Sequence, residues 1–368
     1  MRVLIAAGGT GGHLYPAKAL ASYLVKQRLV KNILWIGGKK EIEAKIISSQ
    51  YQFKKINIQY CPRTLSLKWI KFIWGLIISF FQSFLIITQF KPTIVVGMGS
   101  FHSYPLIISA YFKRIPTVIF EQNVFLSLTN KFLLQWTSAI AISFSQTQKY
   151  IPLKKRKKTF LTGNPVREEI IKEEKKEALK KLGLSEETFT LLFLGGSQGA
   201  HSLNLYGTEA LRLLEKESLP WKIQVIFLTG RKDYKWVKDS LESLIFQFIV
   251  FPYLEKIESA YAASQLVIAR SGATTIAEIT VRGLPSILIP YPYAASHHQL
   301  KNAKVLQEKG ASCLILEKDL CGETLEKNIL KLIKNQELLR KMSEKSKRLG
   351  KPEATREAVK LILKIAKK

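Results

Sequence analysis

The sequence predicts an α/β protein built from two doubly wound parallel sheets. Short, continuously apolar runs such as RVLIAA and TLLFLGG alternate with helical segments, a pattern typical of parallel strands buried on both faces. The chain has 368 residues, which is more than one hydrophobic core usually organises. A strand, a glycine loop and a helix near the N-terminus recur about half a chain later, so each domain is expected to open with the same unit.

The positions of the strands and of the domain borders follow from this pattern. Strands are expected at residues 2–7, 32–37, 93–98, 116–121 and 139–143 in the first half, and at 190–196, 222–230, 248–253, 266–270 and 286–291 in the second. Helices fit the intervals and give right-handed crossovers. We expect an N-terminal domain over 1–162, a C-terminal domain over 163–345 that faces it across a cleft, and a terminal helix over 346–368 that packs back on the N-terminal domain.

Two glycine-rich loops stand where a strand leads into a helix. The first is GGTGGH, from Gly8 to His13, and the second is GGSQGAH, from Gly195 to His201. Bare N–H groups at a helix N-terminus form a good anion site, because the helix dipole and the unpaired donors add. Neither loop is a dinucleotide fingerprint or a P-loop, which disfavours a nicotinamide enzyme or a P-loop NTPase. The alternative is a tight turn without a ligand, and the repetition favours the ligand.

A third strand-to-helix turn, LVIARSGATTIAEI, adds candidate nucleotide contacts. Residues 271–275 offer backbone donors for a diphosphate, and Glu278 follows one turn later, where a carboxylate can accept from ribose hydroxyls. The alternative for Glu278 is a partner for the helix dipole. Gln299 stands near the start of a later helix and suits sugar hydroxyls. No metal site is expected, because the histidines lack ligand spacing and the aspartates form no D-x-D motif.

The chain is strongly basic, with 57 Lys and Arg against 28 Asp and Glu and a formal net charge of +29. This excess implies an anionic partner, which is a phosphorylated substrate, an anionic membrane surface or a nucleic acid. The absence of a nucleic-acid-binding motif in the sequence disfavours the last of these. Three cysteines without a C-x-x-C pair indicate a reducing cytosol rather than a disulfide framework or a zinc site.

Residues 72–90, FIWGLIISFFQSFLIITQF, carry no charge and are long enough to span a bilayer. A strand-like run follows at once, so a span would split the first domain. We therefore expect a helix that lies on an anionic membrane surface, with a buried helix and a true span as the alternatives. Basic residues that would face such a surface lie near the segment: Lys54, Lys55, Arg63, Lys68 and Lys71.

Seven stretches follow one another in the order of a known family: GGTGGHLYP, GMGSFHSYP, EQNVFLSLTNKFL, TGNPVR, LFLGGSQGAHSLN, ARSGATTIAEI and HQLKNA. Together they resemble the MurG family of peptidoglycan N-acetylglucosaminyltransferases, over nearly the whole chain. The resemblance implies two Rossmann-like domains of the GT-B class. It also implies inverting transfer of GlcNAc from UDP-GlcNAc to lipid I, undecaprenyl-pyrophosphoryl-MurNAc-pentapeptide, which gives lipid II.

The same resemblance implies the setting of the reaction and a donor site. It implies no cofactor, no metal, a peripheral place on the cytoplasmic face of the bacterial inner membrane, and contact with other cell-wall synthesis enzymes. The positions that match the family's UDP-GlcNAc site are Thr10, Gly11, Gly12, Asn123, Arg167, Ser197, Leu254, Ala273, Thr274, Thr275, Ile276, Ala277, Glu278 and Gln299. Within this set Asn123 would contact the transferred sugar, and Arg167 and Ser197 would hold the diphosphate.

Two residues compete for the role of catalytic base in this reading. His13 follows the first glycine loop, where it would deprotonate the attacking hydroxyl of the acceptor. The alternative for His13 is to bind substrate or to brace the loop. Glu121 is the competing base.

The chain departs from the family pattern on the acceptor side. Phe120 stands where His is usual, and Ser100, Phe101 and Tyr104 stand where Gly, Tyr and Gly are common. These departures bear on the acceptor and its peptide more than on the donor. The alternative activity is that of another lipid-directed GT-B transferase, which would use UDP-glucose or UDP-galactose. The alternative class is a nucleic-acid-binding protein without enzymatic activity.

Overall fold

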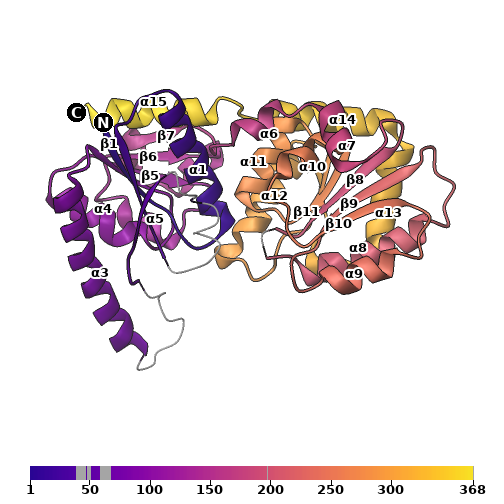
Figure 1. Cartoon of the computed structure of the whole chain (residues 1–368), viewed down its shortest axis with the longest axis horizontal. Coiled ribbons are helices and arrows are strands. Elements are labelled where there is room, and N and C mark those ends of the chain that lie inside the picture. The colour runs from indigo at the N-terminus through magenta and orange to yellow at the C-terminus, as the bar shows by residue number, and fades with distance from the viewer. Residues whose placement is uncertain (39–46, 48–50, 59–67, 197, 368) are drawn as a thin grey trace. The chain divides into compact units, whose positions relative to one another are not determined.

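The computed structural model describes residues 1–38, 47, 51–58, 68–196 and 198–367 (Figure 1). Its contacts divide the chain into two compact units, one of Met1–Arg167 with Glu353–Lys368 and one of Glu168–Pro352. The borders expected from the sequence, at 162/163 and 345/346, lie a few residues earlier. Each unit holds a parallel sheet with helical crossovers, so the expected fold class of two doubly wound α/β domains is confirmed.

In the described part of the first unit, a seven-stranded sheet has the order β3-β2-β1-β4-β5-β6-β7, with all neighbours parallel. Its strands are β1 (Arg2–Ala6), β2 (Asn32–Gly37), β3 (Gln52–Lys55), β4 (Ile94–Gly97), β5 (Thr117–Glu121), β6 (Ala139–Ile142) and β7 (Thr159–Leu161). Its helices are α1 (Gly11–Lys26), α3 (Lys68–Phe90), α4 (Ser103–Phe112), α5 (Leu128–Leu133) and α15 (Ala354–Ala366), with 3-10 turns η1 (Ser145–Tyr150) and η2 (Leu153–Lys158).

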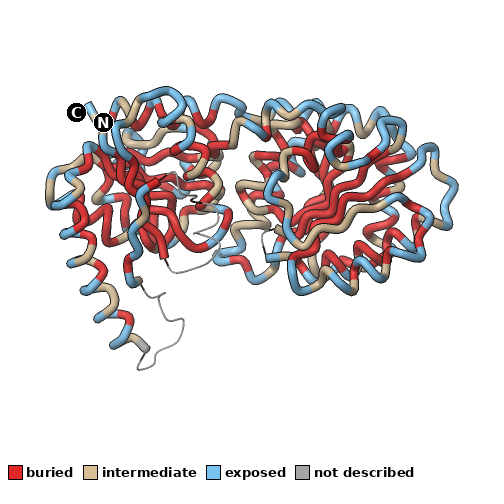
Figure 2. Tube along the Cα trace, viewed as in Figure 1, coloured by how far each residue is buried: buried red, intermediate tan, exposed pale blue. Residues whose placement is uncertain are grey.

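The sheet of the first unit is buried on both faces, as its apolar strands require. In β1, Val3 and Ile5 belong to a core cluster with α1 and α15, whereas Leu4 and Ala6 belong to a second cluster with α3 and α4. The last helix, α15, contributes one apolar face to the first cluster: Ala358, Val359, Leu361, Ile362 and Ile365. The buried central strands stand out in Figure 2.

Over the residues described in the second unit, a six-stranded parallel sheet has the order β10-β9-β8-β11-β12-β13. Its strands are β8 (Phe189–Leu194), β9 (Ile223–Leu228), β10 (Gln247–Phe251), β11 (Leu266–Ala269), β12 (Ser286–Leu288) and β13 (Ser312–Leu314). Its helices are α6 (Glu168–Lys172), α7 (Lys175–Leu182), α8 (His201–Leu214), α9 (Tyr234–Leu241), α10 (Ile257–Ala263), α11 (Ala273–Arg282), α12 (His298–Glu308), α13 (Gly322–Lys334) and α14 (Gln336–Leu349), with 3-10 turns η3 (Ala295–His297) and η4 (Glu317–Asp319).

The core of the second unit includes a close contact between α8 and the sheet. The rings of Phe193 in β8 and Phe227 in β9 stack with centroids 4.7 Å apart. A Cβ at Gly207 of α8 would lie 3.1 Å from both rings, which is tighter than ordinary van der Waals contact. Glycine therefore lets the helix backbone approach the stacked pair.

Three short edge strands were not expected from the sequence. β3 reads QFKK and is mostly exposed, β7 has three residues that are half-buried or exposed, and β13 has three residues of which two are half-buried. An edge strand pairs on one side only and can stay partly exposed, so it does not need a continuous run of apolar residues. The apolar pattern therefore identified the interior strands and β10, and it left out the other edges.

Parallel pairing brings the carboxyl ends of all strands in a sheet to one edge. The strand order reverses between β1 and β4 in the first unit and between β8 and β11 in the second. Ligands of open α/β sheets bind outside the carboxyl ends at such a reversal. Both glycine loops and the turn after β11 lie at these two positions, one set in each unit.

Candidate functional site

The first glycine loop joins β1 to α1 and is tied to the neighbouring loop after β4. The Gly8 N–H donates to Ser100 Oγ at 3.3 Å, and Ser103 Oγ donates to the Ala6 carbonyl at 3.2 Å. Thr10 is the exposed N-cap of α1, and its side chain makes no capping hydrogen bond. His13 lies in the first turn and is half-buried, with its N–H donating to the Thr10 carbonyl at 3.1 Å.

Three residues that depart from the family pattern have local roles in the loop after β4. Ser100 supplies the hydroxyl that accepts from Gly8. Phe101 and Tyr104 stack almost parallel, with ring centroids 6.2 Å apart, and Phe101 also lies 5.9 Å from Phe72 of α3. Tyr104 also packs on Phe80 of α3, with ring centroids 5.9 Å apart, a contact that the family's common glycine could not make.

Glu121 ends β5 and is almost completely buried. Its Oε1 accepts from the N–H and the Nδ2 of Asn123, at 3.1 and 3.3 Å. Its Oε2 accepts from the Ser127 N–H at 2.7 Å and from Asn130 Nδ2 at 2.8 Å. Burial raises the pKa of Glu121 above its ordinary value, although the four hydrogen bonds oppose this shift. The carboxyl group thus organises the loop over 122–127 and orients Asn123.

Arg167 ends the N-terminal segment of the first unit and lies beside the helix that follows the first glycine loop. Its guanidinium carbon is 4.4 Å from the centroid of the Tyr15 ring of α1. The preceding residue is fixed to α15, because the Val166 N–H donates to Thr355 Oγ1 at 3.1 Å and that hydroxyl donates to the Val166 carbonyl at 2.8 Å. The structure therefore places the Arg167 guanidinium against Tyr15, which lies two residues after His13 in α1.

The second glycine loop packs tightly against the loop after β9. Ser197, expected to hold the diphosphate, lies outside the described residues. A Cβ at Gly199, whose φ is +80°, would lie 2.3 Å from the Thr229 carbonyl oxygen. A Cβ at Gly195 would lie 2.6 Å from the Ala200 nitrogen. Both positions therefore require glycine for the close approach of backbone to backbone.

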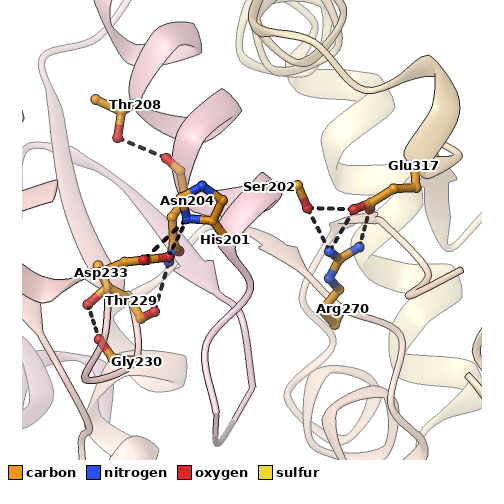
Figure 3. A network of polar contacts seen from close by, with 9 residues as sticks. All are labelled: His201, Ser202, Asn204, Thr208, Thr229, Gly230, Asp233, Arg270 and Glu317. Carbon is orange, nitrogen blue, oxygen red and sulfur yellow. Dashed lines mark hydrogen bonds and ion pairs between the residues drawn. The ribbon is translucent and has the colours of Figure 1, made fainter. Parts of the chain in front are cut away.

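Two polar groups flank the start of α8 (Figure 3). On one side, Arg270 pairs with Glu317 and its Nη2 donates to Ser202 Oγ at 2.8 Å. Burial acts to raise the pKa of Glu317, but hydrogen bonds from Arg270 and Ser202 outweigh it and hold the pKa below its usual range. On the other side, Asp233 contacts His201 Nδ1 at 3.1 Å.

Asp233 is held in place by more than this histidine. Asn204 Nδ2 donates to Asp233 Oδ2 at 2.7 Å and also to the Thr229 carbonyl at 2.8 Å. Burial acts to raise the pKa of Asp233, and hydrogen bonds from Asn204, Trp236 and His201 lower it below the ordinary value. Sequence reasoning identified neither Glu317 nor Asp233, since both are far along the chain from their partners and carry no local motif.

The turn after β11 leads into α11 as expected. Gly272 is the N-cap, and Thr274 and Thr275 are half-buried in the first turn. Ile276 is buried, and its N–H donates to the Gly272 carbonyl at 2.9 Å. Glu278 is also buried, and its Oε2 accepts from the Tyr261 hydroxyl at 3.1 Å.

Gln299 and Leu254 lie at the same edge of the second sheet. The Tyr291 N–H donates to Gln299 Oε1 at 3.0 Å, and Ser271 Oγ donates to the Gln299 carbonyl at 2.9 Å. Leu254 is half-buried in the segment between β10 and α10. Gln299 therefore ties α12 to the turn that precedes α11, the turn expected to hold a diphosphate.

The expected site residues thus form one group in each unit. The group in the first unit contains Thr10, Gly11, Gly12, His13, Glu121, Asn123 and Arg167, and the group in the second contains Leu254, Ala273, Thr274, Thr275, Ile276, Ala277, Glu278 and Gln299. In the part of the chain that the structure describes, no cluster of three or more His, Cys, Asp or Glu is arranged to hold a metal ion.

The apolar segment at 72–90 forms most of helix α3, so the expected helix is confirmed. The helix is long and apolar enough to cross a membrane by length and composition, and 28% of its most apolar window is buried. Its polar residues Ser79 and Ser83 are buried on the packed face. Its exposed face carries eight large apolar side chains: Ile70, Ile73, Trp74, Ile77, Ile78, Phe81, Phe84 and Leu85. Of the basic residues expected to flank it, Lys54, Lys55 and Lys71 are exposed, and Arg63 lies outside the described residues.

Comparison with known proteins places the chain among sugar transferases. Residues 3–142 match the glycosyltransferase family 28 N-terminal domain, and residues 190–359 match its C-terminal domain. A protein of Thermodesulfovibrio yellowstonii is 43% identical over 96% of both chains, and one of Halothermothrix orenii is 39% identical over the full length of both. Both are named UDP-N-acetylglucosamine–N-acetylmuramyl-(pentapeptide) pyrophosphoryl-undecaprenol N-acetylglucosamine transferase. The crystal structure of Acinetobacter baumannii MurG superposes with a TM-score of 0.76 at 24% identity and covers 99% of each chain, which supports the fold.

Proposed function

The chain belongs to the family of UDP-N-acetylglucosamine–N-acetylmuramyl-(pentapeptide) pyrophosphoryl-undecaprenol N-acetylglucosamine transferases, and from this premise we propose how its residues perform the transfer. The chain is a glycosyltransferase that moves GlcNAc from UDP-GlcNAc to lipid I in peptidoglycan synthesis. The reaction is a single in-line displacement at the anomeric carbon, with inversion. Catalysis then needs three things: position of the two substrates, removal of a proton from the acceptor hydroxyl, and stabilisation of charge on the departing UDP.

His13 is the catalytic base in this proposal. It lies in the first turn of α1, at the carboxyl edge of the first sheet, where it is half-buried rather than packed in the core. An imidazole there can accept the proton of the attacking hydroxyl while the bare backbone of Gly11 and Gly12 allows the sugar to come close. This position of His13 is the observation that supports the mechanism most strongly.

Glu121 is a positioning residue in the same scheme. Its two oxygens accept four hydrogen bonds from within its own loop, so the carboxylate is already engaged where a base would need to face the acceptor. Two of the four donors belong to Asn123, which would contact the transferred sugar. The carboxylate therefore acts on the reaction by holding Asn123 in one orientation.

The leaving diphosphate is stabilised by Arg167, by the backbone of the second glycine loop with Ser197, and by the N-terminus of α11 at Ala273–Thr275. Helix N-termini and an arginine place fixed positive charge where negative charge develops on UDP. Glu278 would accept from the ribose and Gln299 from the sugar hydroxyls, and the backbone of Leu254 would contact the uracil. Ile276 and Ala277 belong to the same turn and shape it. The scheme uses no metal ion.

The enzyme works on a membrane surface in this proposal, at the cytoplasmic face of the bacterial inner membrane. The exposed apolar face of α3 would enter the interface, while Lys54, Lys55 and Lys71 would meet anionic headgroups. The net charge of +29 adds a general attraction to such a surface. Other cell-wall synthesis enzymes would be neighbours there.

A transfer assay tests the proposed function directly. Radiolabelled UDP-GlcNAc and a lipid I analogue should give a product that carries one additional GlcNAc by mass. UDP-glucose and UDP-galactose serve as competing donors. Preference for either of these donors would identify a different lipid-directed transferase and contradict the proposal.

A vesicle-binding assay tests the membrane face. Replacement of Ile73, Trp74, Ile77 and Phe81 by Ser should strongly weaken binding to anionic vesicles and leave transfer to short-chain acceptors intact, because these side chains are exposed and none belongs to the proposed donor site. The wild-type protein should be partly released by high salt, since salt screens only the electrostatic part of binding. Resistance of the wild-type protein to alkaline carbonate would mean that α3 spans the bilayer.

A further inference from the structure

The second unit holds a cavity at the edge of its sheet that lies opposite the glycine loop. Its volume is about 540 Å3, within the range of small-molecule sites. Phe189 is the first residue of β8, and Gln265 and Pro285 immediately precede β11 and β12. Because the strands are parallel, these residues mark the amino edge of the sheet. The cavity, called the amino-edge pocket below, is therefore separate from the proposed donor site at the carboxyl edge.

The interior of the amino-edge pocket is apolar. Phe189, Leu284 and Ile333 are buried residues of its lining, and Leu339 of α14 is half-buried beside them. Trp221, also in the lining, leaves 42% of its surface exposed. An apolar floor with an accessible indole suits a ligand that has an aromatic or aliphatic body.

Three neutral polar side chains of the lining make hydrogen bonds within the protein. Ser264 Oγ donates to the Ala260 carbonyl at 2.5 Å, and Ser343 Oγ donates to the Gly283 carbonyl at 2.7 Å. Gln265 Oε1 accepts from the Thr190 N–H at 2.8 Å. The strongest polar contacts that the lining can offer a ligand come from its charged side chains.

Among the charged side chains of the lining, Arg282 is half-buried and the others are exposed. It is the last residue of α11. Its Nη1 donates to the carbonyls of Ile170, Ile171 and Glu173, at 3.4, 3.1 and 2.9 Å. Within the described residues, no hydrogen bond uses its Nε or Nη2. One edge of a guanidinium thus stays available beside an apolar cavity, which is the geometry that favours a carboxylate or a phosphate.

The remaining charges of the lining are more exposed. Arg340 is exposed and its Nη1 already pairs with Glu344. Glu186 and Glu187 are exposed on the segment before β8, where solvent screens them. Glu173 and Glu174 act on Arg282 from outside the lining, and within the lining the charge that is half-buried is positive.

We propose that the amino-edge pocket binds a small amphiphilic anion. The apolar body of this ligand packs on Phe189, Leu284 and Trp221, and its carboxylate or phosphate accepts hydrogen bonds from Arg282. The same guanidinium holds the end of α6, the helix that starts immediately after Arg167. The ligand therefore binds beside the segment that carries a proposed diphosphate contact, without occupying the donor site itself.

Titration calorimetry on the full chain tests this proposal with two probes of the same shape and opposite charge. Naphthalene-2-carboxylate should bind saturably with one molecule per chain. The cation 2-naphthylmethylammonium should bind at least about tenfold more weakly, because it offers no acceptor to Arg282. Equal binding of the two probes, or no saturable binding of the carboxylate at millimolar concentration, would overturn the proposal.

Three variants locate the bound probe. Ser343→Phe places a ring inside the lining and should abolish carboxylate binding, whereas Arg282→Gln should weaken it about tenfold or more. Arg348→Gln removes the same charge from α14 outside the pocket and should bind the probe like the wild type. Arg282→Gln also releases the end of α6, so Ser343→Phe provides the test that does not depend on that contact. Its fold is checked by thermal unfolding and by UDP binding. Unchanged binding in a folded Ser343→Phe variant would place the probe elsewhere, on the apolar face of α3 for example, and would contradict the proposal.

Discussion

The carboxyl edges of the two sheets hold one carboxylate each in opposite surroundings, with Glu121 buried and Glu317 half-buried. In the first unit, Glu121 meets only uncharged donors, and burial raises its pKa. In the second unit, Glu317 pairs with Arg270, and its pKa lies below the usual range because these hydrogen bonds outweigh burial. The comparison shows that the neighbours of a carboxylate decide whether its pKa is raised or lowered at two otherwise similar sheet edges. In our proposal the first edge meets the acceptor hydroxyl and the sugar, and the second edge holds the diphosphate of UDP.

The two carboxylates should also respond oppositely to pH. The pKa of Glu121 is raised on folding, so its contribution to stability is complete below the unfolded pKa and is lost as the pH rises through the folded value. The pKa of Glu317 is lowered on folding, so its contribution is present above the unfolded pKa and is lost as the pH falls through the folded value. In a plot of stability against pH, removal of Glu121 should therefore change the acid side relative to its pKa, and removal of Glu317 should change the side above its pKa.

The largest expected effect is at His13. His13→Ala should lower kcat by about 10²–10⁴, because it removes the general base, while the KM for UDP-GlcNAc changes little. Steady-state kinetics with a lipid I analogue measures both constants. Asn123→Ala is the contrasting variant, since loss of a sugar contact should affect the donor KM as well. A loss of less than tenfold in kcat for His13→Ala would assign this histidine to binding or to bracing the loop.

The next prediction concerns stability and is made at Arg270. Arg270→Met leaves Glu317 without its cation and leaves the Ile289 carbonyl without the donor that now lies at 3.1 Å, so the free energy of unfolding should fall by about 3 kcal/mol. Urea unfolding at neutral pH measures this change. The double variant Arg270→Met, Glu317→Gln should recover part of the loss, because it removes the uncompensated charge. The deficit of Arg270→Met should shrink as the pH falls below the ordinary Glu pKa of 4.5, where Glu317 becomes neutral when unpaired. A deficit that is constant with pH would show that the ion pair does not carry the effect.

A smaller effect is expected at Glu121. Glu121→Gln keeps the shape of the side chain but directs an NH2 group at donors that now point to a carboxylate, so Asn123 loses its fixed orientation. We expect kcat to fall about tenfold, and the free energy of unfolding to fall by about 1–3 kcal/mol. Chemical denaturation and steady-state kinetics measure the two effects on the same preparation. Asn130→Asp is a useful companion, because it disturbs the same carboxylate from the other side of the loop. A kcat that falls as far as in His13→Ala would return the base role to Glu121.

The smallest effect is expected at Glu278 and concerns donor binding. Glu278→Gln should raise the Kd for UDP about tenfold, since a charge-assisted contact to the ribose contributes about 1.5–3 kcal/mol. In the wild type, 2′-deoxy-UDP should bind more weakly than UDP, and in the variant this difference should shrink. Calorimetry measures all four affinities. An unchanged difference would mean that Glu278 does not contact the 2′-hydroxyl and serves the interior of the unit through Tyr261.

The sequence predicted the interior strands because their apolar runs reflect burial on both faces. It did not predict β3, β7 and β13, since edge strands that are this short and only partly buried carry no such run. The glycine loops were visible because glycine is required wherever backbone must approach backbone, as at Gly199. The backbone N–H groups at the start of α11 could be predicted from the sequence, because a strand, a turn of small residues and a helix follow one another there.

The parts of the site that depend on tertiary contacts could not be predicted. Glu317 lies beside Arg270 only because the fold brings the segments that follow β11 and β13 together at the carboxyl edge of the sheet. The engagement of Glu121 by four donors depends on how the loop over 122–127 folds back, and the sequence left this residue open as a base. Arg167 approaches Tyr15 because the end of the first unit returns to the first helix. Long-range contacts of this kind have no local signature.

The pH dependence of kcat in three proteins tests the central claim most directly, namely that His13 removes the proton and Glu121 positions Asn123. Transfer to a short-chain lipid I analogue should be measured across the acid and neutral range for the wild type, His13→Ala and Glu121→Gln. The acid limb of the profile, where the base becomes protonated, should be present in the wild type. It should persist unshifted in Glu121→Gln at a lower plateau, and it should vanish in His13→Ala. An acid limb that survives in His13→Ala and disappears in Glu121→Gln would contradict the account and make Glu121 the base.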